Sequence, residues 1–99
     1  MGKIFAIICD LKSKSHDYSC LFNQLTKSNW CHYIQSTWLI ETDDTVEQIW
    51  NRIEYTIDRK DFVLIIEVHK NYRGQLPADA WNWINERVKD MTLKESEKM

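Results

Sequence analysis

Two blocks of the chain are apolar at nearly every position. Residues 3–11 (KIFAIICDL) are also rich in isoleucine, and residues 61–68 (DFVLIIEV) in isoleucine and valine. Runs of this length and composition are typical of strands, and the first reads as a central strand that is covered on both faces. We therefore expect two strongly apolar strands, of which the first ends at an acidic residue, Asp10.

Between these blocks, residues 30–42 (WCHYIQSTWLIET) alternate with a period of two, which predicts a long strand with two different faces. One face is expected to meet the helices and holds Trp30, Ile34, Trp38 and Ile40. The other, semi-polar face is expected on the open side of the sheet and holds Cys31, Tyr33, Gln35, Thr37 and Leu39. Gln35 and Ser36 in the middle predict a bulge or a break into two short strands.

Three segments carry apolar residues at helical spacing. The first follows a capping residue, Asp17, and has the stripe Tyr18, Leu21, Phe22 and Leu25. The second opens with a capping box over residues 44–47 (DTVE) and has the stripe Val46, Ile49, Trp50, Ile53 and Ile57. The third begins at Pro77, with Asp79 in its first turn, and has the stripe Ala80, Trp83, Ile84 and Val88.

The order is thus strand, helix, long strand, helix, strand, helix. It predicts an α+β fold, a ferredoxin-like two-layer sandwich (β-α-β(β)-α-β) with an additional C-terminal helix. Both main helices should cover one face of the sheet. We expect one domain over residues 1–88 and a polar, frayed tail over residues 89–99.

Composition narrows the classes of function. The 99 residues are 43% hydrophobic, enough for one core, and the net charge is −2 with charges of both signs mixed. Such a balance does not favour broad nucleic-acid binding. Three widely spaced cysteines indicate free thiols in a reducing compartment. No apolar run suits a signal peptide or a membrane span, so we expect a cytoplasmic protein without membrane contact.

The open face of the predicted sheet is apolar. The residues expected there are Phe5, Ile7, Cys9, Tyr33, Leu39, Val63 and Ile65, or their neighbours of opposite parity. Patches of this breadth seldom stay exposed in a soluble monomer, so either the C-terminal helix folds over the face or two copies bury it. We favour a homodimer with Tyr33, Leu39 and Trp81 in its interface.

A resemblance to known families rests on four segments: Cys9-Asp10-Leu11, residues 33–41 (YIQSTWLIE), residues 61–68, and residues 76–83 (LPADAWNW). Together they resemble the small ferredoxin-like subunit of the CRISPR spacer-integration complex and virulence-associated protein D. The layout is closer still to a group of short uncharacterised bacterial and phage proteins. The resemblance implies a homodimer built on the sheet face. It also implies a metal-dependent nuclease whose Asp10 holds a divalent ion between subunits.

Four groups of residues are candidates for chemistry. Asp10 would need a partner if it is buried, and two copies across a twofold axis could bind Mg²⁺ or Mn²⁺; alternatively it is a turn aspartate. Glu41 and Glu67 could add ligands to that site, or are simply exposed or paired. Lys12, Lys14 and His16 could contact phosphate or relay a proton, or form a solvated loop. The basic-aromatic cluster of His69, Lys70, Tyr72 and Arg73 suits a phosphate, a base or a protein partner, or is a polar connection.

Two functions remain from different classes. The first is a non-catalytic homodimeric interaction module, in phage–host conflict or a mobile element, with a protein partner at the C-terminal helix or near Arg73. The second is a divalent-metal-dependent endonuclease, which we expect to act on RNA rather than DNA, with Asp10 as the metal ligand. The chain has no Gly-rich phosphate loop, nucleophile elbow, HExxH or Cys-x-x-Cys motif. We favour the first function because no acid or base can be assigned to work beside Asp10.

Overall fold

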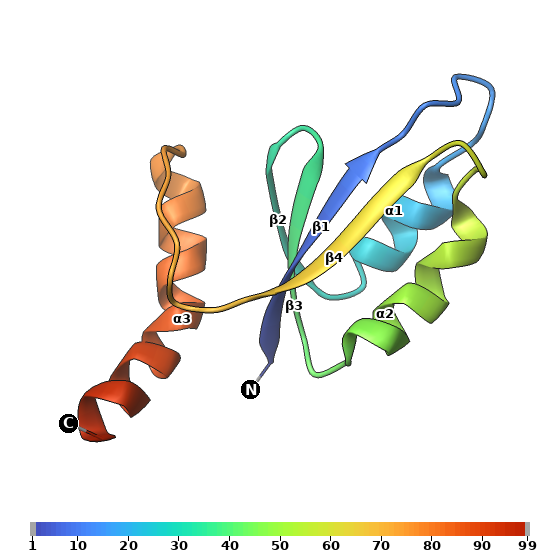
Figure 1. Ribbon diagram of the computed structural model, residues 1–99. Coiled ribbons are helices and arrows are strands. Elements are labelled where there is room, and N and C mark those ends of the chain that lie inside the picture. Colours follow the sequence, from blue (N-terminus) through green and yellow to red (C-terminus); the bar gives the residue numbers. More distant parts are fainter. Residues whose placement is uncertain (1, 99) are drawn as a thin grey trace.

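The computed structural model describes the backbone of residues 2–98 and the side chains of residues 2–88. Figure 1 shows the elements, which follow the order β1 (Lys3–Asp10), α1 (Ser19–Leu25), β2 (Asn29–Ile34), β3 (Thr37–Thr42), α2 (Val46–Ile53), a 3-10 turn η1 (Glu54–Thr56), β4 (Phe62–Val68) and α3 (Ala78–Lys98). The chain is therefore a small α+β domain. Much of the tail predicted over residues 89–99 lies outside the described side chains.

The four strands form one antiparallel sheet in the order β2-β3-β1-β4. The predicted long strand is broken at Gln35 and Ser36 into β2 and β3, which pair as a hairpin. β1 lies inside the sheet between β3 and β4, as its apolar sequence predicts. β2 and β4 are the two edge strands.

The first core lies between the sheet and the helices α1 and α2, which cover the same face (Figure 1). Successive strand residues point to opposite faces, so Phe5, Ile7 and Cys9 of β1 turn together toward these helices. The buried members of this core are Phe5, Ile7, Cys9, Leu21, Leu25, Trp38, Ile40, Ile49 and Ile53. The prediction that both main helices share one face is confirmed.

The second core lies on the other face of the sheet, where α3 covers one end. Ile4 points away from its neighbour Phe5 and packs with Ile84 and Val88 of α3. An ion pair of 3.2 Å between Arg87 Nε and Glu41 Oε1 ties α3 to the sheet. The helix begins at Ala78, one residue after the predicted start at Pro77. β1 is thus apolar on both faces because a core lies on each side of it.

Two helix starts differ from the prediction. The capping box of α2 is formed by Thr45 and Gln48, one residue later than expected. The Thr45 hydroxyl accepts from the Gln48 N–H at 3.1 Å, and the Gln48 side chain accepts from the Thr45 N–H at 2.8 Å. Helix α1 begins at Ser19, whose N–H donates to the Asp17 carboxylate at 2.9 Å. The Ser19 bonds lower the pKa of Asp17 below its ordinary value.

One residue of β2 lies on the face opposite to the predicted one. The register between β2 and β3 shifts between Cys31 and Ile34, so that Ile34 pairs with Thr37. This irregularity turns Ile34 to the α3 side, where it lines a cavity together with Leu39. The strict alternation that placed Ile34 with Trp38 is therefore wrong at this position.

Candidate functional site

Asp10 ends β1 on the face opposite to the first core. It pairs with Phe62 of β4, and its side chain shares a face with Ile8. The side chain is 65% exposed, and its Oδ2 lies 3.5 Å from Nζ of Lys12. The condition that Asp10 is buried at the strand end is therefore not met. A solvated carboxylate needs no metal to compensate its charge.

The residues around Asp10 do not form a metal centre within one copy of the chain. Mg²⁺ and Mn²⁺ take several oxygen ligands, whereas Glu41 and Glu67 lie at the far end of the sheet, opposite Ile4 and Phe5 of β1. No group of three His, Cys, Asp or Glu among the side chains of residues 2–88 is placed to hold a metal. An ion at Asp10 would need ligands from a second copy.

The loop after β1 holds its predicted site residues in different ways. Lys12 pairs with Asp10, and its ammonium lies 4.8 Å from the centre of the Phe62 ring. Lys14 is exposed. His16 donates from Nε2 to the carbonyl of Thr56 at 2.8 Å, which fastens the loop to η1. This contact gives His16 a structural role.

Asp61 is a buried carboxylate, whereas the sequence predicts only that a strand begins there. It is 8% exposed and accepts hydrogen bonds from the Lys12 N–H at 2.7 Å and the Asp58 N–H at 2.8 Å. The Tyr18 hydroxyl lies 2.8 Å from both of its oxygens. Burial alone would raise the pKa of Asp61, but these bonds and the charge of His16 hold it below its ordinary value.

This carboxylate joins three segments of the chain: the loop after β1, the start of α1 and the turn before β4. Two of its donors, Lys12 and Tyr18, are distant in sequence, and the third, Asp58, lies three residues before it. The negative charge is thus compensated by hydrogen bonds, as a buried carboxylate requires. We assign Asp61 a structural role, since its two oxygens are occupied by these donors.

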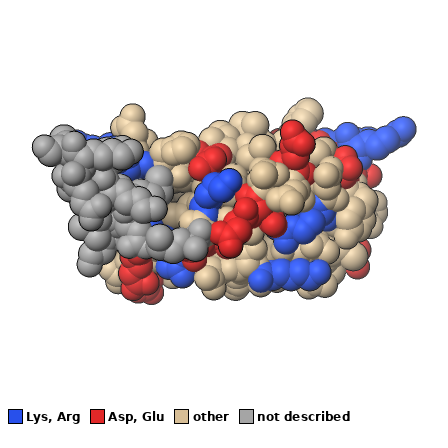
Figure 2. All heavy atoms as spheres, turned by 90° about the horizontal axis from the view of Figure 1, so that it is seen from below, with Lys and Arg blue, Asp and Glu red and all other residues tan. Residues whose placement is uncertain are grey.

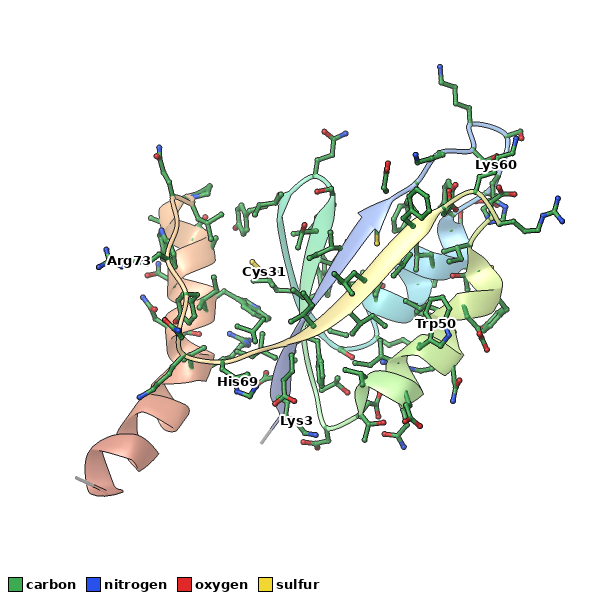
Figure 3. The ribbon with its side chains drawn as sticks, viewed as in Figure 1. Lys3, Cys31, Trp50, Lys60, His69 and Arg73 are labelled. Atoms are coloured by element: carbon green, nitrogen blue, oxygen red, sulfur yellow. The ribbon has the colours of Figure 1, made fainter. Side chains whose placement is uncertain are left out.

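The basic-aromatic cluster lies in the connection between β4 and α3. Tyr72 packs inward and stacks on Trp81, with ring centres 6.2 Å apart, and burial raises the pKa of its hydroxyl. His69 Nε2 lies 4.0 Å from Oε2 of Glu67. Arg73 is exposed and points away from the sheet (Figure 3). Lys70 is also exposed. The structure therefore keeps Tyr72 and Arg73 together at one cavity, of which His69 and Lys70 are not lining residues.

Beneath this connection lies an apolar cavity of about 270 Å³ between the sheet and α3. Two of the predicted interface residues, Leu39 and Trp81, line it and are partly covered within the chain. The third, Tyr33, is exposed on β2. Leu39 packs against α3, and Trp81, which belongs to α3, stacks on Tyr72 of the connection, which leaves less of their surface for a second copy.

The broadest exposed apolar region gathers around β4. Among residues 2–88, eleven large hydrophobic side chains are exposed, and six of them lie on β4 or beside it. We call these six the β4 apolar surface: Ile8, Val46, Trp50, Phe62, Leu64 and Ile66. Phe62, Leu64 and Ile66 are 65%, 55% and 46% exposed. The open face is thus occupied by the neighbours of opposite parity, while Val63 and Ile65 pack against the first core.

Two hollows lie along β4 within this surface. One, of about 390 Å³, is bordered by Ile8, Asp10 and Phe62, and the other, of about 290 Å³, by Val46 and Trp50 of α2. Both reach Leu64. Figure 3 shows Trp50 on the side of α2 that faces β4. Its exposure, at 38%, departs from the prediction that the whole α2 stripe is core.

On the face that Figure 2 shows, basic and acidic side chains lie interspersed, without a stripe of one sign. A phosphate backbone is held by clustered lysines and arginines, which this face lacks. In the part of the chain that is described, no helix has the length and apolar character needed to cross a membrane.

Comparisons with protein-family models, with curated proteins and with solved structures found no match to this chain.

Proposed function

We propose that this chain is a non-catalytic homodimeric interaction module on a ferredoxin-like core. The observation that carries the proposal is the β4 apolar surface. It lies beside a solvated Asp10, and among the side chains of residues 2–88 no group of three metal ligands includes it. A setting in phage–host conflict or in a mobile element follows from the sequence resemblance alone. A protein partner would have the exposed side of α3 and the region of Arg73 available.

The ferredoxin-like assignment is supported by two features. The elements follow the order β-α-β-β-α-β before α3, and the antiparallel sheet has the order β2-β3-β1-β4. In this arrangement each helix connects two strands that have one other strand between them. The additional helix α3 lies on the face that a two-layer sandwich leaves open.

The size of the apolar surface supports self-association. From their exposed fractions, the six side chains present on the order of 500 Å² per copy, against about 800 Å² per partner in a standard interface. At about 25 cal/mol per Å², each 100 Å² of this area that a partner covers contributes about 2.5 kcal/mol before the costs of association. Surfaces of this kind in soluble proteins mark binding sites.

The test is the mass of the purified protein in solution, combined with an assay for cleavage. We expect twice the chain mass of 11.9 kDa by light scattering at micromolar concentration. We also expect no degradation of RNA or DNA above the level of a mock preparation, with Mg²⁺ or Mn²⁺ present. A monomer at 100 µM, about a hundred times a micromolar dissociation constant, would contradict the proposal.

A second candidate function is a divalent-metal-dependent endonuclease. It is favoured by one observation: Asp10 is exposed at the rim of a hollow, so that a second copy could bring its own Asp10 close. That function predicts cleavage that depends on Mn²⁺ and is lost in Asp10→Asn. Asp43→Asn, which alters another exposed aspartate, is the matched control.

A further inference from the structure

The edge of β4 is unprotected. Alternate residues of an edge strand direct their N–H and C=O groups away from the sheet, where they can pair with another strand. β4 is seven residues long, pairs with β1 in unbroken register, and contains no proline or lysine. Proteins usually blunt such an edge with charges, a proline or a bulge. Glu67 is the single charged residue of the strand.

The other edge strand, β2, likewise contains no proline or lysine, but it differs from β4 in its register, its polar residues and its cover. Its register is interrupted between Cys31 and Ile34, and it carries the polar residues Asn29 and His32. It also contacts α3, toward which Cys31 points in Figure 3. A bulged, partly covered strand is a poor template for pairing. Of the two edges, β4 is therefore the one that is open to another chain.

Helix α3 also restricts how two copies can meet. Stacked sheets lie about 10 Å apart, which is also the diameter of a helix. Because α3 lies on the open face over Ile4, Leu39 and Val68, it occupies the space that a second sheet would need. Flat stacking of the two open faces, as the sequence resemblance implies, is obstructed at that end.

We infer that two copies join edge to edge, with β4 antiparallel to β4 of the second copy around a twofold axis at Ile65. The result is one continuous eight-stranded sheet. This inference rests on the proposed homodimer and specifies its interface. The occupant is a second copy because an antiparallel pair of identical strands is self-complementary.

Register follows from the residues of the strand. Ile65 is the middle of Phe62–Val68, so an axis there pairs all seven residues. Leu64 then faces Ile66 of the partner subunit, and Phe62 faces Val68 of the partner subunit. Cross-strand pairs of this kind stabilise sheets. An axis at Leu64 would instead place Asp61 opposite Glu67 of the partner subunit, which brings two acidic residues together.

Trp50 extends the interface beyond the backbone. Together with Val46 it forms the wall of a hollow beside Val63, Leu64 and Ile65. Across the proposed axis, the two Trp50 side chains flank the paired strands on the helix-covered face, and Leu64 and Ile66 meet on the other. Tryptophan is enriched among the residues that dominate interfaces. The interface is thus apolar on both sides of the new strand pair.

This dimer is incompatible with a shared metal site at Asp10. Asp10 pairs with Phe62, three residues from the axis and one strand further in. At about 3.4 Å per residue and 4.8 Å per strand, the two Asp10 Cα atoms lie roughly 25 Å apart. Two carboxylates at that separation cannot bridge one ion. The edge-to-edge dimer therefore excludes the endonuclease function in its intersubunit form.

Disulfide cross-linking tests the register. In a Cys20→Ser background, whose remaining cysteines are buried, we would prepare Leu64→Cys, Ile66→Cys and, for the other edge, Tyr33→Cys. Mild oxidation of a mixture of Leu64→Cys and Ile66→Cys is expected to give a covalent dimer. Each variant alone places its cysteines diagonally, about 7–8 Å apart, beyond the range for a disulfide. Tyr33→Cys should stay monomeric in the denaturing gel.

Light scattering of the same samples distinguishes a failure of edge pairing from a failure of the homodimer. If the mass is that of a dimer but the mixture does not cross-link, edge pairing is wrong and the homodimer still holds. Cross-linking of Leu64→Cys or Ile66→Cys with itself would overturn the register, and a monomeric mass would overturn both. As a second measurement, Trp50→Ala should weaken the dimer about tenfold or more, whereas Trp30→Ala, a tryptophan far from β4, should leave it unchanged. Equal effects of the two substitutions would contradict the inference.

Discussion

Replacing Asp61 by asparagine tests whether this buried carboxylate holds the loop after β1, α1 and the turn before β4 together. The change keeps the size of the side chain and removes one of its two accepting oxygens. In the wild type, the Lys12 N–H and the Asp58 N–H each donate to a different oxygen, and the Tyr18 hydroxyl donates between them. An asparagine places its NH₂ group against one of these backbone donors.

The expected loss of stability follows from these contacts. A hydrogen bond to a charged acceptor contributes about 1.5–3 kcal/mol, and a buried donor left without a partner costs about 1–3 kcal/mol. Since Asp61 is 8% exposed, water replaces little of what is lost. We expect Asp61→Asn to lower the free energy of unfolding by about 3 kcal/mol. With an m-value of about 1.5 kcal/mol/M, the urea midpoint falls by about 2 M.

The assay is urea unfolding followed by tryptophan fluorescence, with Asp43→Asn as the matched control at an exposed aspartate. The control should change the free energy of unfolding by less than about 0.5 kcal/mol. Because the pKa of Asp61 is held below its ordinary value of 3.8, its contribution is present above that pH and is lost as pH falls through the folded-state value. The difference between wild type and Asp61→Asn should therefore shrink below pH 3.8. Equal midpoints for the two variants at pH 7 would refute the reasoning.

Three further predictions concern other contacts. Cys20 is the exposed thiol, whereas Cys9 and Cys31 are buried. Burial raises the pKa of Cys9 to about 11, with a further contribution from the charge of Asp61. One thiol should therefore react rapidly with a disulfide reagent at pH 8, and all three should react in urea. Thr45→Ala removes the capping box of α2 and should cost about 1 kcal/mol of unfolding free energy, measured by urea titration; no change would contradict the cap. Arg87→Met breaks the ion pair with Glu41 and should cost about 1 kcal/mol, and that cost should fall when Glu41→Gln is already present, as a double-mutant cycle would show.

The strands and helices could be predicted because their signals are local. The break at Gln35 and Ser36 and the helix after Pro77 follow from residue types within a few positions. The faces of the apolar strands were harder to assign. β1 is apolar on both sides because the first core covers one face and the second core covers Ile4 on the other, where Ile8 stays exposed. β4 is apolar on both sides, with Phe62, Leu64 and Ile66 exposed on one face. The same sequence pattern thus has two physical origins, which only the packing of α3 distinguishes.

Asp61 shows why the candidate site could be predicted only in part. Its partners Lys12 and Tyr18 lie 49 and 43 residues away, so no spacing near Asp61 indicates them. By contrast, Asp10 attracts attention because an acidic residue ends an apolar run. The structure reverses the environments of the two: Asp10 is solvated and Asp61 is buried. A buried carboxylate can be identified from sequence only when its distant donors are known.

The second core has a consequence for the order in which the chain can fold during synthesis. It joins Ile4 to Ile84 and Val88, so it closes only when α3 has left the ribosome. The first core draws its members from residues 5–65 and can assemble earlier. In the interval, the sheet exposes Ile4 together with the β4 apolar surface. A nascent chain at that stage presents its widest apolar face, and is then most open to chaperones and to premature pairing with other chains.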